Sequence, residues 1–268
     1  MTDDRPERRL RHIEGLLLDI DGVLTVSWHP IPGAVEAVDQ LRSRGVRFRL
    51  LTNTTELTRA QLLERLRAAG FDLDPQEVVT APVVAAAYLR ANHPGARCFV
   101  LSAIDLSEDL EGIDVTGDRA DVVVIGGATD PFPAAQSNRA FRMVLDGAEL
   151  VALHRSISWM TADGMTLDAG VMLVAGLEEA TGRRAVVCGK PSPECFRQSV
   201  ALLGIPADRA AMVGDDVRND VLAAQTAGMT GVLVRTGKYR PEDVERAGGR
   251  PDLVIDSVAD LPDLLRSG

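Results

Sequence analysis

Two carboxylates stand close together near the start of the chain, at the point where an apolar run ends. Residues 16–25 read LLLDIDGVLT, in which one isoleucine separates Asp19 from Asp21 and Gly22 follows directly. An Asp-Gly pair is common in turns, so a single acid here would indicate only a turn. Two acids are harder to explain in that way, because neighbouring carboxylates at a partly buried strand end repel each other. The pair therefore predicts a functional site that needs a compensating positive charge.

The same arrangement returns late in the chain. Residues 212–220 read MVGDDVRND, so that Asp215, Asp216 and Asp220 follow a short apolar run and a glycine. If this strand lies beside the first, all these carboxylates crowd one crevice and need a compensating cation. Ligands that are all oxygen suit Mg²⁺ best. The alternative is that the acids are solvated at two unrelated loop ends.

Hydroxyl, amide and ammonium groups follow two further apolar runs. Thr52 and Asn53 end the run FRLLTN, and Lys190 follows the run VVCG and precedes Pro191, which keeps the chain extended. A lone lysine usually lies on the surface. At the end of a strand, Lys190 is a better candidate for a phosphate contact.

Strand-like and helix-like segments alternate along almost the whole chain, which predicts an α/β fold with a doubly wound, mostly parallel, Rossmann-like sheet. Ligands of such sheets bind in the crevice at the carboxyl ends of the strands, where the residues above are placed. The stretch 81–185 repeats the alternation with strands of its own. We therefore expect a catalytic core formed by 1–80 plus 186–268 and an inserted α/β cap domain formed by 81–185. The strands expected in the core are 15–20, 46–52, 185–189, 210–215, 230–235 and 252–256.

Taken in order, these motifs resemble those of the haloacid dehalogenase superfamily. The long insert between the threonine and lysine motifs is similar to the type-C2 cap of one of its subgroups. Each motif is short, but four in order, each at a strand end, form a specific pattern. The matching segments are Asp19–Gly22, Thr52–Asn53, Gly189–Pro191 and Gly214–Asp216 with Asp220.

The resemblance implies a mechanism of phosphoryl transfer. Asp19 would be the nucleophile that forms an aspartyl-phosphate, and Asp21 would be the general acid and base. An acid at the second position indicates a phosphatase or a mutase within this superfamily. Thr52, Asn53 and Lys190 would bind the phosphoryl group.

The resemblance also implies a Mg²⁺ cofactor. Asp19, Asp21 through its backbone carbonyl, and Asp215 would be metal ligands, while Asp216 and Asp220 would orient waters or Lys190 around them. In the cap, His154 at a strand end is a possible substrate contact, although such a histidine is more often structural.

The composition restricts the partners. A net charge of −10 argues against a nucleic-acid or membrane-surface ligand. The three cysteines, Cys98, Cys188 and Cys195, have no metal-type spacing and are expected to be reduced and buried in a cytoplasmic protein. The basic loop with Arg235, Lys238 and Arg240 suggests an anion site, but we favour its interpretation as a solvated loop near the sheet edge.

The leading hypothesis is a Mg²⁺-dependent phosphatase that acts on a small phosphorylated metabolite. The resemblance to the type-C2 subgroup suggests pyrophosphate or a phosphoramidate as the substrate, and p-nitrophenyl phosphate as an artificial substrate. A phosphomutase on the same core is the nearest alternative. Two further alternatives are less favoured. One is a phospho-signalling receiver, and the other is a catalytically idle protein that binds a phospho-ligand. A homodimer formed through the cap is a weaker expectation.

Overall fold

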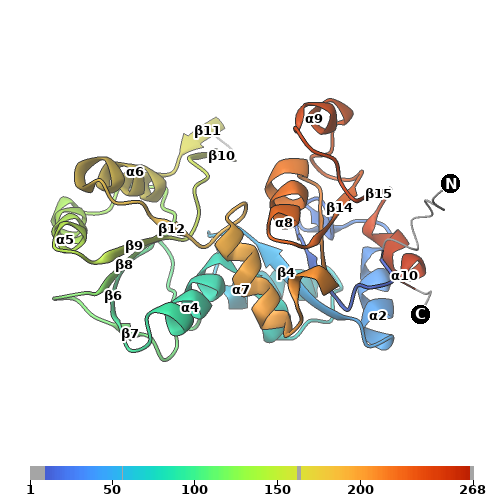
Figure 1. The fold of residues 1–268 in the computed structure, drawn as a ribbon, viewed down its shortest axis with the longest axis horizontal. Coiled ribbons are helices and arrows are strands. Elements are labelled where there is room, and N and C mark those ends of the chain that lie inside the picture. Colours follow the sequence, from blue (N-terminus) through green and yellow to red (C-terminus); the bar gives the residue numbers. More distant parts are fainter. Residues whose placement is uncertain (1–9, 56, 162–163, 266–268) are drawn as a thin grey trace. The chain divides into compact units, whose positions relative to one another are not determined.

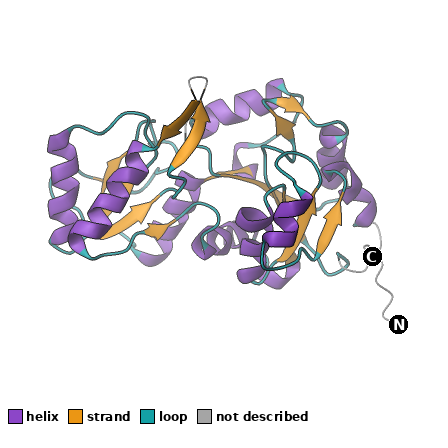
Figure 2. Cartoon of the chain, turned by 90° about the horizontal axis from the view of Figure 1, so that it is seen from above, coloured by secondary structure: helices purple, strands orange, loops and turns teal. Residues whose placement is uncertain are grey.

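Two parallel β-sheets organise the chain, one in each of two units (Figure 1). The computed structural model describes residues 10–55, 57–161 and 164–265. The first unit comprises Met1–Thr52, Ala60–Val79 and Phe196–Gly268, and the second comprises Asn53–Arg59 and Thr80–Cys195. In Figure 2 the strands of both sheets stand out from the helices and loops around them.

The first sheet has six strands in the order β15-β14-β13-β1-β4-β5. Its central strand β1 reads GLLL and is buried along its whole length. A continuous apolar run is what a parallel strand covered on both faces requires. The strands are β1 (Gly15–Leu18), β4 (Arg47–Thr52), β5 (Val78–Thr80), β13 (Ala210–Gly214), β14 (Thr230–Val234) and β15 (Leu253–Ile255).

Strand β1 lies where the strand order reverses, because β4 pairs with one side of it and β13 with the other. Leu18 is level with Leu50 of β4 and with Val213 of β13, and both pairings are parallel. Crevices at such a reversal, outside the carboxyl ends of the strands, are where open α/β sheets bind ligands.

Helices and short turns connect these strands. In α2 the apolar residues Ala34, Ala37, Val38 and Leu41 form the buried side of the helix, at the spacing of an amphipathic helix. The helices are α2 (Ala34–Ser43), α3 (Arg59–Ala68), α7 (Pro193–Leu203), α8 (Ala223–Thr226), α9 (Pro241–Arg246) and α10 (Leu261–Leu264). The short turns are η1 (Pro75–Glu77), η2 (Ala207–Arg209), η3 (Val217–Leu222) and η4 (Val258–Asp260), and a hairpin joins β2 (Thr25–Val26) to β3 (His29–Pro30).

The second unit has a five-stranded sheet in the order β12-β9-β8-β6-β7. Helices α5 and α6 pack on one of its faces, where Val144 and Val174 meet Val123 and Leu150 in a common core. The strands are β6 (Arg97–Leu101), β7 (Asp114–Val115), β8 (Val122–Ile125), β9 (Glu149–Ala152) and β12 (Val186–Val187), with a separate hairpin β10 (Ser158–Thr161) and β11 (Gly164–Leu167). The helices are α4 (Ala81–Asn92), α5 (Ala134–Leu145) and α6 (Ala169–Thr181).

The predicted α/β fold with parallel sheets is confirmed. One strand lies elsewhere than expected: Val186–Val187 pairs with β9 of the second sheet, not with the core strands. The second unit therefore includes residues 186–195 as well as 53–59. Hydrophobic alternation indicates that a short segment is a strand, but it does not specify which sheet the strand joins.

Within the part of the chain that the structure describes, no helix combines the length and the apolar character needed to cross a membrane.

Candidate active site

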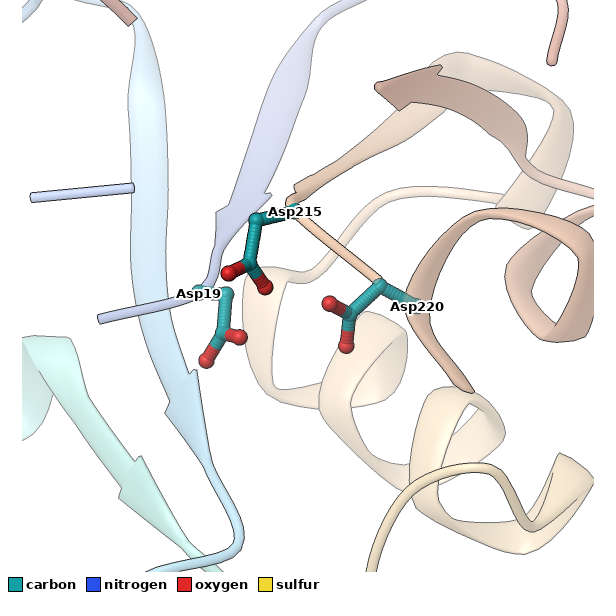
Figure 3. Close-up of side chains that lie close together, drawn as sticks. All are labelled: Asp19, Asp215 and Asp220. Carbon is teal, nitrogen blue, oxygen red and sulfur yellow. The ribbon is translucent and has the colours of Figure 1, made fainter. Parts of the chain in front are cut away.

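Three buried carboxylates converge at the carboxyl edge of the first sheet (Figure 3). Asp19, Asp215 and Asp220 each offer one oxygen atom, and these oxygens all lie within 4.8 Å of one another. Their side chains are only 7%, 2% and 1% exposed. Because like charges buried so close together repel strongly, the cluster is suited to a cation.

The two central strands place Asp19 and Asp215. The Asp19 N–H continues the sheet pairing and donates to the Val213 carbonyl oxygen at 2.9 Å. Asp215 directly follows Gly214, the last residue of β13. The prediction that the two acidic strand ends lie side by side is therefore confirmed by the β1–β13 pairing.

Asp220 reaches the cluster from a turn of π-helix, η3, that follows β13. A Cβ atom on Gly214 would come within 2.6 Å of the Asp220 Cγ atom. The absence of a side chain at Gly214 therefore allows Asp220 to pack directly against the strand end.

Asp216 does not lie in the cluster with the preceding residue, Asp215. Its Oδ1 accepts the N–H groups of Arg218 and Asn219 at 3.0 Å each, and its Oδ2 accepts the Asn219 side-chain amide at 2.7 Å. Burial raises the pKa of Asp216, but these hydrogen bonds and the charge of Lys238 outweigh burial and lower the pKa below its ordinary value. Asp216 is thus the N-cap of η3 and lies outside the three-carboxylate cluster.

The loop that contains Lys238 is exposed to solvent at this residue, as the sequence analysis expected, but it also contacts the cluster, which the sequence analysis did not predict. The Lys238 N–H donates to Asp215 Oδ2 at 2.7 Å, and Thr236 Oγ1 donates to the Gly22 carbonyl at 2.5 Å. The signal was present in the sequence, because this segment follows β14 just as the other site residues follow their strands.

The Lys238 side chain lies in the field of the carboxylates. Desolvation lowers its pKa, but the charges of Asp215, Asp19, Asp220 and Asp216 together raise the pKa above its ordinary value. Lys238 is therefore protonated at neutral pH. A cavity of about 490 Å³ adjoins it, lined in part by Asp215, Asp216, Tyr239 and Arg240.

The remaining predicted residues of the first unit lie at the same sheet edge. Asp21 is exposed in the turn after β1, bridged to Thr25. Thr52 ends β4 and is 7% exposed.

Asn53 and Lys190 meet in the second unit, in an arrangement that the sequence did not predict. The Asn53 side-chain amide donates to the Lys190 carbonyl at 2.7 Å, and the Lys190 N–H donates to Asn53 Oδ1 at 2.7 Å. Both ends of the Asn53 side chain are thus engaged with the Lys190 backbone. The role in phosphate binding that the sequence analysis gave to Asn53 stays a prediction.

His154 is buried among polar side chains of the second unit. Its Nε2 atom lies 3.3 Å from Thr55 Oγ1 and 3.4 Å from Asp168 Oδ2. Asp168 also caps α6 by accepting the Val171 N–H at 2.8 Å. These contacts favour a structural role for His154, and its predicted contact with substrate stays a prediction.

The donor set of the cluster fits a hard divalent cation. Asp19, Asp215 and Asp220 supply only carboxylate oxygens, which Mg²⁺ prefers, and a small number of protein ligands leaves positions for water and phosphate. Asp220 joins this carboxylate set, whereas the sequence analysis placed it around the metal ligands.

Family models and curated relatives match most of the chain. A family model described as haloacid dehalogenase-like hydrolase matches residues 16–116, and a second model of HAD-like hydrolases matches residues 187–261. The chain is 38% identical to human haloacid dehalogenase-like hydrolase domain-containing protein 2 over 92% of its own length and 93% of that protein. It is 37% identical to human phospholysine phosphohistidine inorganic pyrophosphate phosphatase over 96% of each chain.

Solved structures give the same result. A p-nitrophenyl phosphatase from Archaeoglobus fulgidus superposes with a TM-score of 0.83 and 32% identity, over 94% of this chain and 98% of that one. NagD from E. coli superposes with a TM-score of 0.82 and 28% identity, over 92% of this chain and 98% of that one. The resemblance seen in the motifs and the prediction of a hydrolase are confirmed, and the chain belongs to the haloacid dehalogenase-like hydrolase family.

Proposed function

We propose that this protein is a Mg²⁺-dependent phosphatase that hydrolyses a small phosphorylated substrate through an aspartyl-phosphate on Asp19. One observation carries the proposal: Asp19, Asp215 and Asp220 converge as buried carboxylates at the reversal point of a parallel sheet. Without a bound cation, such a cluster lowers the stability of the folded chain, because buried like charges repel. Clusters of this kind are typical of functional sites.

Asp19 and Asp21 divide the covalent chemistry. A carboxylate oxygen of Asp19 attacks phosphorus, and the bond from phosphorus to the leaving oxygen breaks while Asp21 protonates that oxygen. Asp21 then takes a proton from water, whose oxygen attacks the same phosphorus and releases inorganic phosphate and the free Asp19 carboxylate. The exposure of Asp21 in the turn after β1 suits a group that exchanges protons with water.

Asp19, Asp215 and Asp220 would hold Mg²⁺ with their carboxylates, and Asp21 would add its backbone carbonyl. When bound, the cation neutralises charge on the phosphoryl group and on the nucleophile. Without it, repulsion between Asp19 and an anionic substrate would oppose the attack.

Thr52 and Lys190 are the proposed phosphate ligands. This assignment rests on the family motifs, which both residues match. Asn53 would contribute indirectly, because its two hydrogen bonds hold the backbone of Lys190 in one position.

The names of the relatives guide the choice of substrate. Phospholysine, phosphohistidine and inorganic pyrophosphate occur in the name of one relative, and 4-nitrophenyl phosphate is the substrate named for two structural neighbours. Each of these compounds carries a phosphoryl group on a small leaving group. We therefore propose small phosphate esters, phosphoramidates or pyrophosphate as the substrate class, handled in the cytoplasm.

The test is phosphate release from p-nitrophenyl phosphate with Mg²⁺ and after its removal by a chelator. The wild type should release phosphate only with the metal, and Asp19→Asn should fall below about one thousandth of the wild-type rate. Asp39→Asn removes an exposed carboxylate of α2 and should leave the rate unchanged.

Release that survives Asp19→Asn would contradict the nucleophile. Release that needs no metal would contradict the role of the carboxylate cluster. If the phosphoryl group passes to an added sugar phosphate rather than to water, the protein is a phosphomutase.

A further inference from the structure

The segment Thr236–Gly237–Lys238, here called the clamp segment, packs directly against Asp215. It is not one of the four motifs described in the sequence analysis, although it lies within residues 187–261, which one of the family models matches. It follows β14, crosses the turn that carries Gly22, and ends with the Lys238 N–H on Asp215 Oδ2.

Two glycines face each other across one carboxylate oxygen. A Cβ atom on Gly22 would overlap Asp215 Oδ2, and a Cβ atom on Gly237 would overlap the same oxygen. The Gly237 Cβ would also stand 2.5 Å from the Gly22 Cα atom. Both glycines have left-handed backbone conformations, with φ of +84° at Gly22 and +62° at Gly237. The approach of two backbones to one oxygen therefore requires glycine at both positions.

A hydrogen bond locks the two loops together. Thr236 Oγ1 donates to the Gly22 carbonyl at 2.5 Å. Thr236 directly precedes Gly237 and Lys238, the two residues that contact Asp215. A buried carboxylate can rotate about its Cα–Cβ and Cβ–Cγ bonds, so it holds a metal well only if neighbouring groups fix its plane. The clamp segment supplies such groups from one side of Asp215.

We propose that the clamp segment is a positioning element that fixes the plane of the Asp215 carboxylate for Mg²⁺. The inference rests on the proposed function, since it takes Asp215 as a metal ligand. The Lys238 N–H binds Oδ2. The backbones of Gly22 and Gly237 pack closely around that oxygen. Thr236 links the two loops by its hydrogen bond to Gly22. Oδ1 is thereby held in the orientation that serves the cation.

The first test removes the lock between the loops. Thr236→Val loses the hydroxyl but keeps the shape of the side chain, and Mg²⁺ affinity measured by calorimetry on the full chain without substrate should fall about tenfold. Thr236→Ser keeps the hydroxyl and should restore wild-type affinity. Thr226→Val is the matched control, because Thr226 Oγ1 also donates to a backbone carbonyl, that of Leu222 in the same unit.

The second test fills the space beside the carboxylate. Gly237→Ala introduces a Cβ that must displace Asp215 Oδ2, and we expect Mg²⁺ affinity to fall about 100-fold. Gly248→Ala is the control: its φ of +78° imposes a similar backbone strain, but nothing lies within 4 Å of the added atom. The difference between the two variants separates crowding at Asp215 and Gly22 from backbone strain.

The outcomes separate this inference from the proposed function. If Thr236→Val binds Mg²⁺ as tightly as the wild type, or if a variant and its control lose equal Mg²⁺ affinity, the clamp is overturned. The proposed function still stands in that case, provided that the wild type needs Mg²⁺ for activity. A wild type that binds no Mg²⁺ would overturn both. If Gly237→Ala fails to fold by circular dichroism, the Thr236 series decides.

Discussion

At the scale of single residues, carboxylates that look alike in the sequence have different surroundings. Asp216 and Asp220 both follow the same strand within six residues, and the sequence analysis placed both around the metal ligands. Asp220 lies in the buried cluster, whereas Asp216 accepts hydrogen bonds from Arg218 and Asn219 and so caps η3. The choice depends on the turn geometry after β13, which residue types do not specify.

This difference gives a first prediction. Asp220→Asn removes one anionic ligand and should lower Mg²⁺ affinity about 10- to 100-fold. Asp216→Asn should change affinity far less, because asparagine is an equally good N-cap. Calorimetric titration of both variants measures the contrast, and equal losses would contradict the assignment.

A second prediction concerns Asn53, which binds the Lys190 backbone through both of its side-chain groups. Asn53→Ala leaves the Lys190 carbonyl and N–H without these partners and should lower the free energy of unfolding by about 1–3 kcal/mol. It should also lower kcat more than it raises KM, since the effect on phosphate passes through Lys190. Urea denaturation and steady-state kinetics measure the two effects.

Asn92→Ala is the control for Asn53. Asn92 donates one hydrogen bond to the Tyr88 carbonyl near the end of α4, so its loss should cost less stability and leave kcat unchanged. A rise in KM alone in Asn53→Ala would instead support the original prediction that Asn53 binds phosphate.

At the scale of secondary-structure elements, the sequence predicted what periodicity and end signals can specify. Helix α7 begins at Pro193, directly after Ser192, and a serine followed by proline is a strong start signal in a sequence. The predicted core strands 46–52 and 230–235 likewise match β4 and β14 to within one residue. The sheet joined by Val186–Val187 could not be predicted, because a pair of valines fits either sheet equally well.

Helix α6 of the second unit gives a prediction on pH. Burial raises the pKa of its N-cap Asp168, but hydrogen bonds from His154, Val171 and Ala128 lower the pKa below the ordinary 3.8. A lowered pKa in the folded state stabilises the protein above pH 3.8, and this contribution is lost as the pH falls through the lowered value.

Asparagine can still cap the helix but replaces hydrogen bonds to a charged group with neutral ones, so we expect Asp168→Asn to lower the free energy of unfolding at pH 7 by about 1 kcal/mol. The gap to wild type should close as the pH falls below 3.8. Urea denaturation at pH 7 and pH 3 measures the gap. Asp146→Asn, an exposed aspartate after α5, should show no gap at either pH, and a gap that widens in acid would contradict the argument.

At the scale of the whole molecule, the chain buries all of its thiols. Cys98, Cys188 and Cys195 are free and buried. Burial raises the pKa of Cys98 to about 11, and burial with neighbouring charges raises that of Cys188 as well. The thiolates of Cys98 and Cys188, which are the reactive forms, are therefore scarce in the native protein.

Native protein should consequently react with a thiol reagent at pH 8 about 100-fold more slowly than protein in guanidinium chloride. All three thiols should be labelled once the chain is unfolded. Spectrophotometric titration follows both rates. Rapid labelling of one thiol in the native protein would show that part of its core opens readily.

The central claim is that Asp19 carries the phosphoryl group, and the most direct measurement is to trap that group. Asp21→Asn removes the base that activates water, while p-nitrophenolate leaves with little help from an acid, so the phosphorylated enzyme should accumulate. We would quench this variant with acid after mixing it with p-nitrophenyl phosphate and Mg²⁺, reduce it with borohydride, and sequence its peptides by mass spectrometry. The account predicts homoserine at position 19 and nowhere else. Homoserine at another position, or none while phosphate is still released, would contradict it.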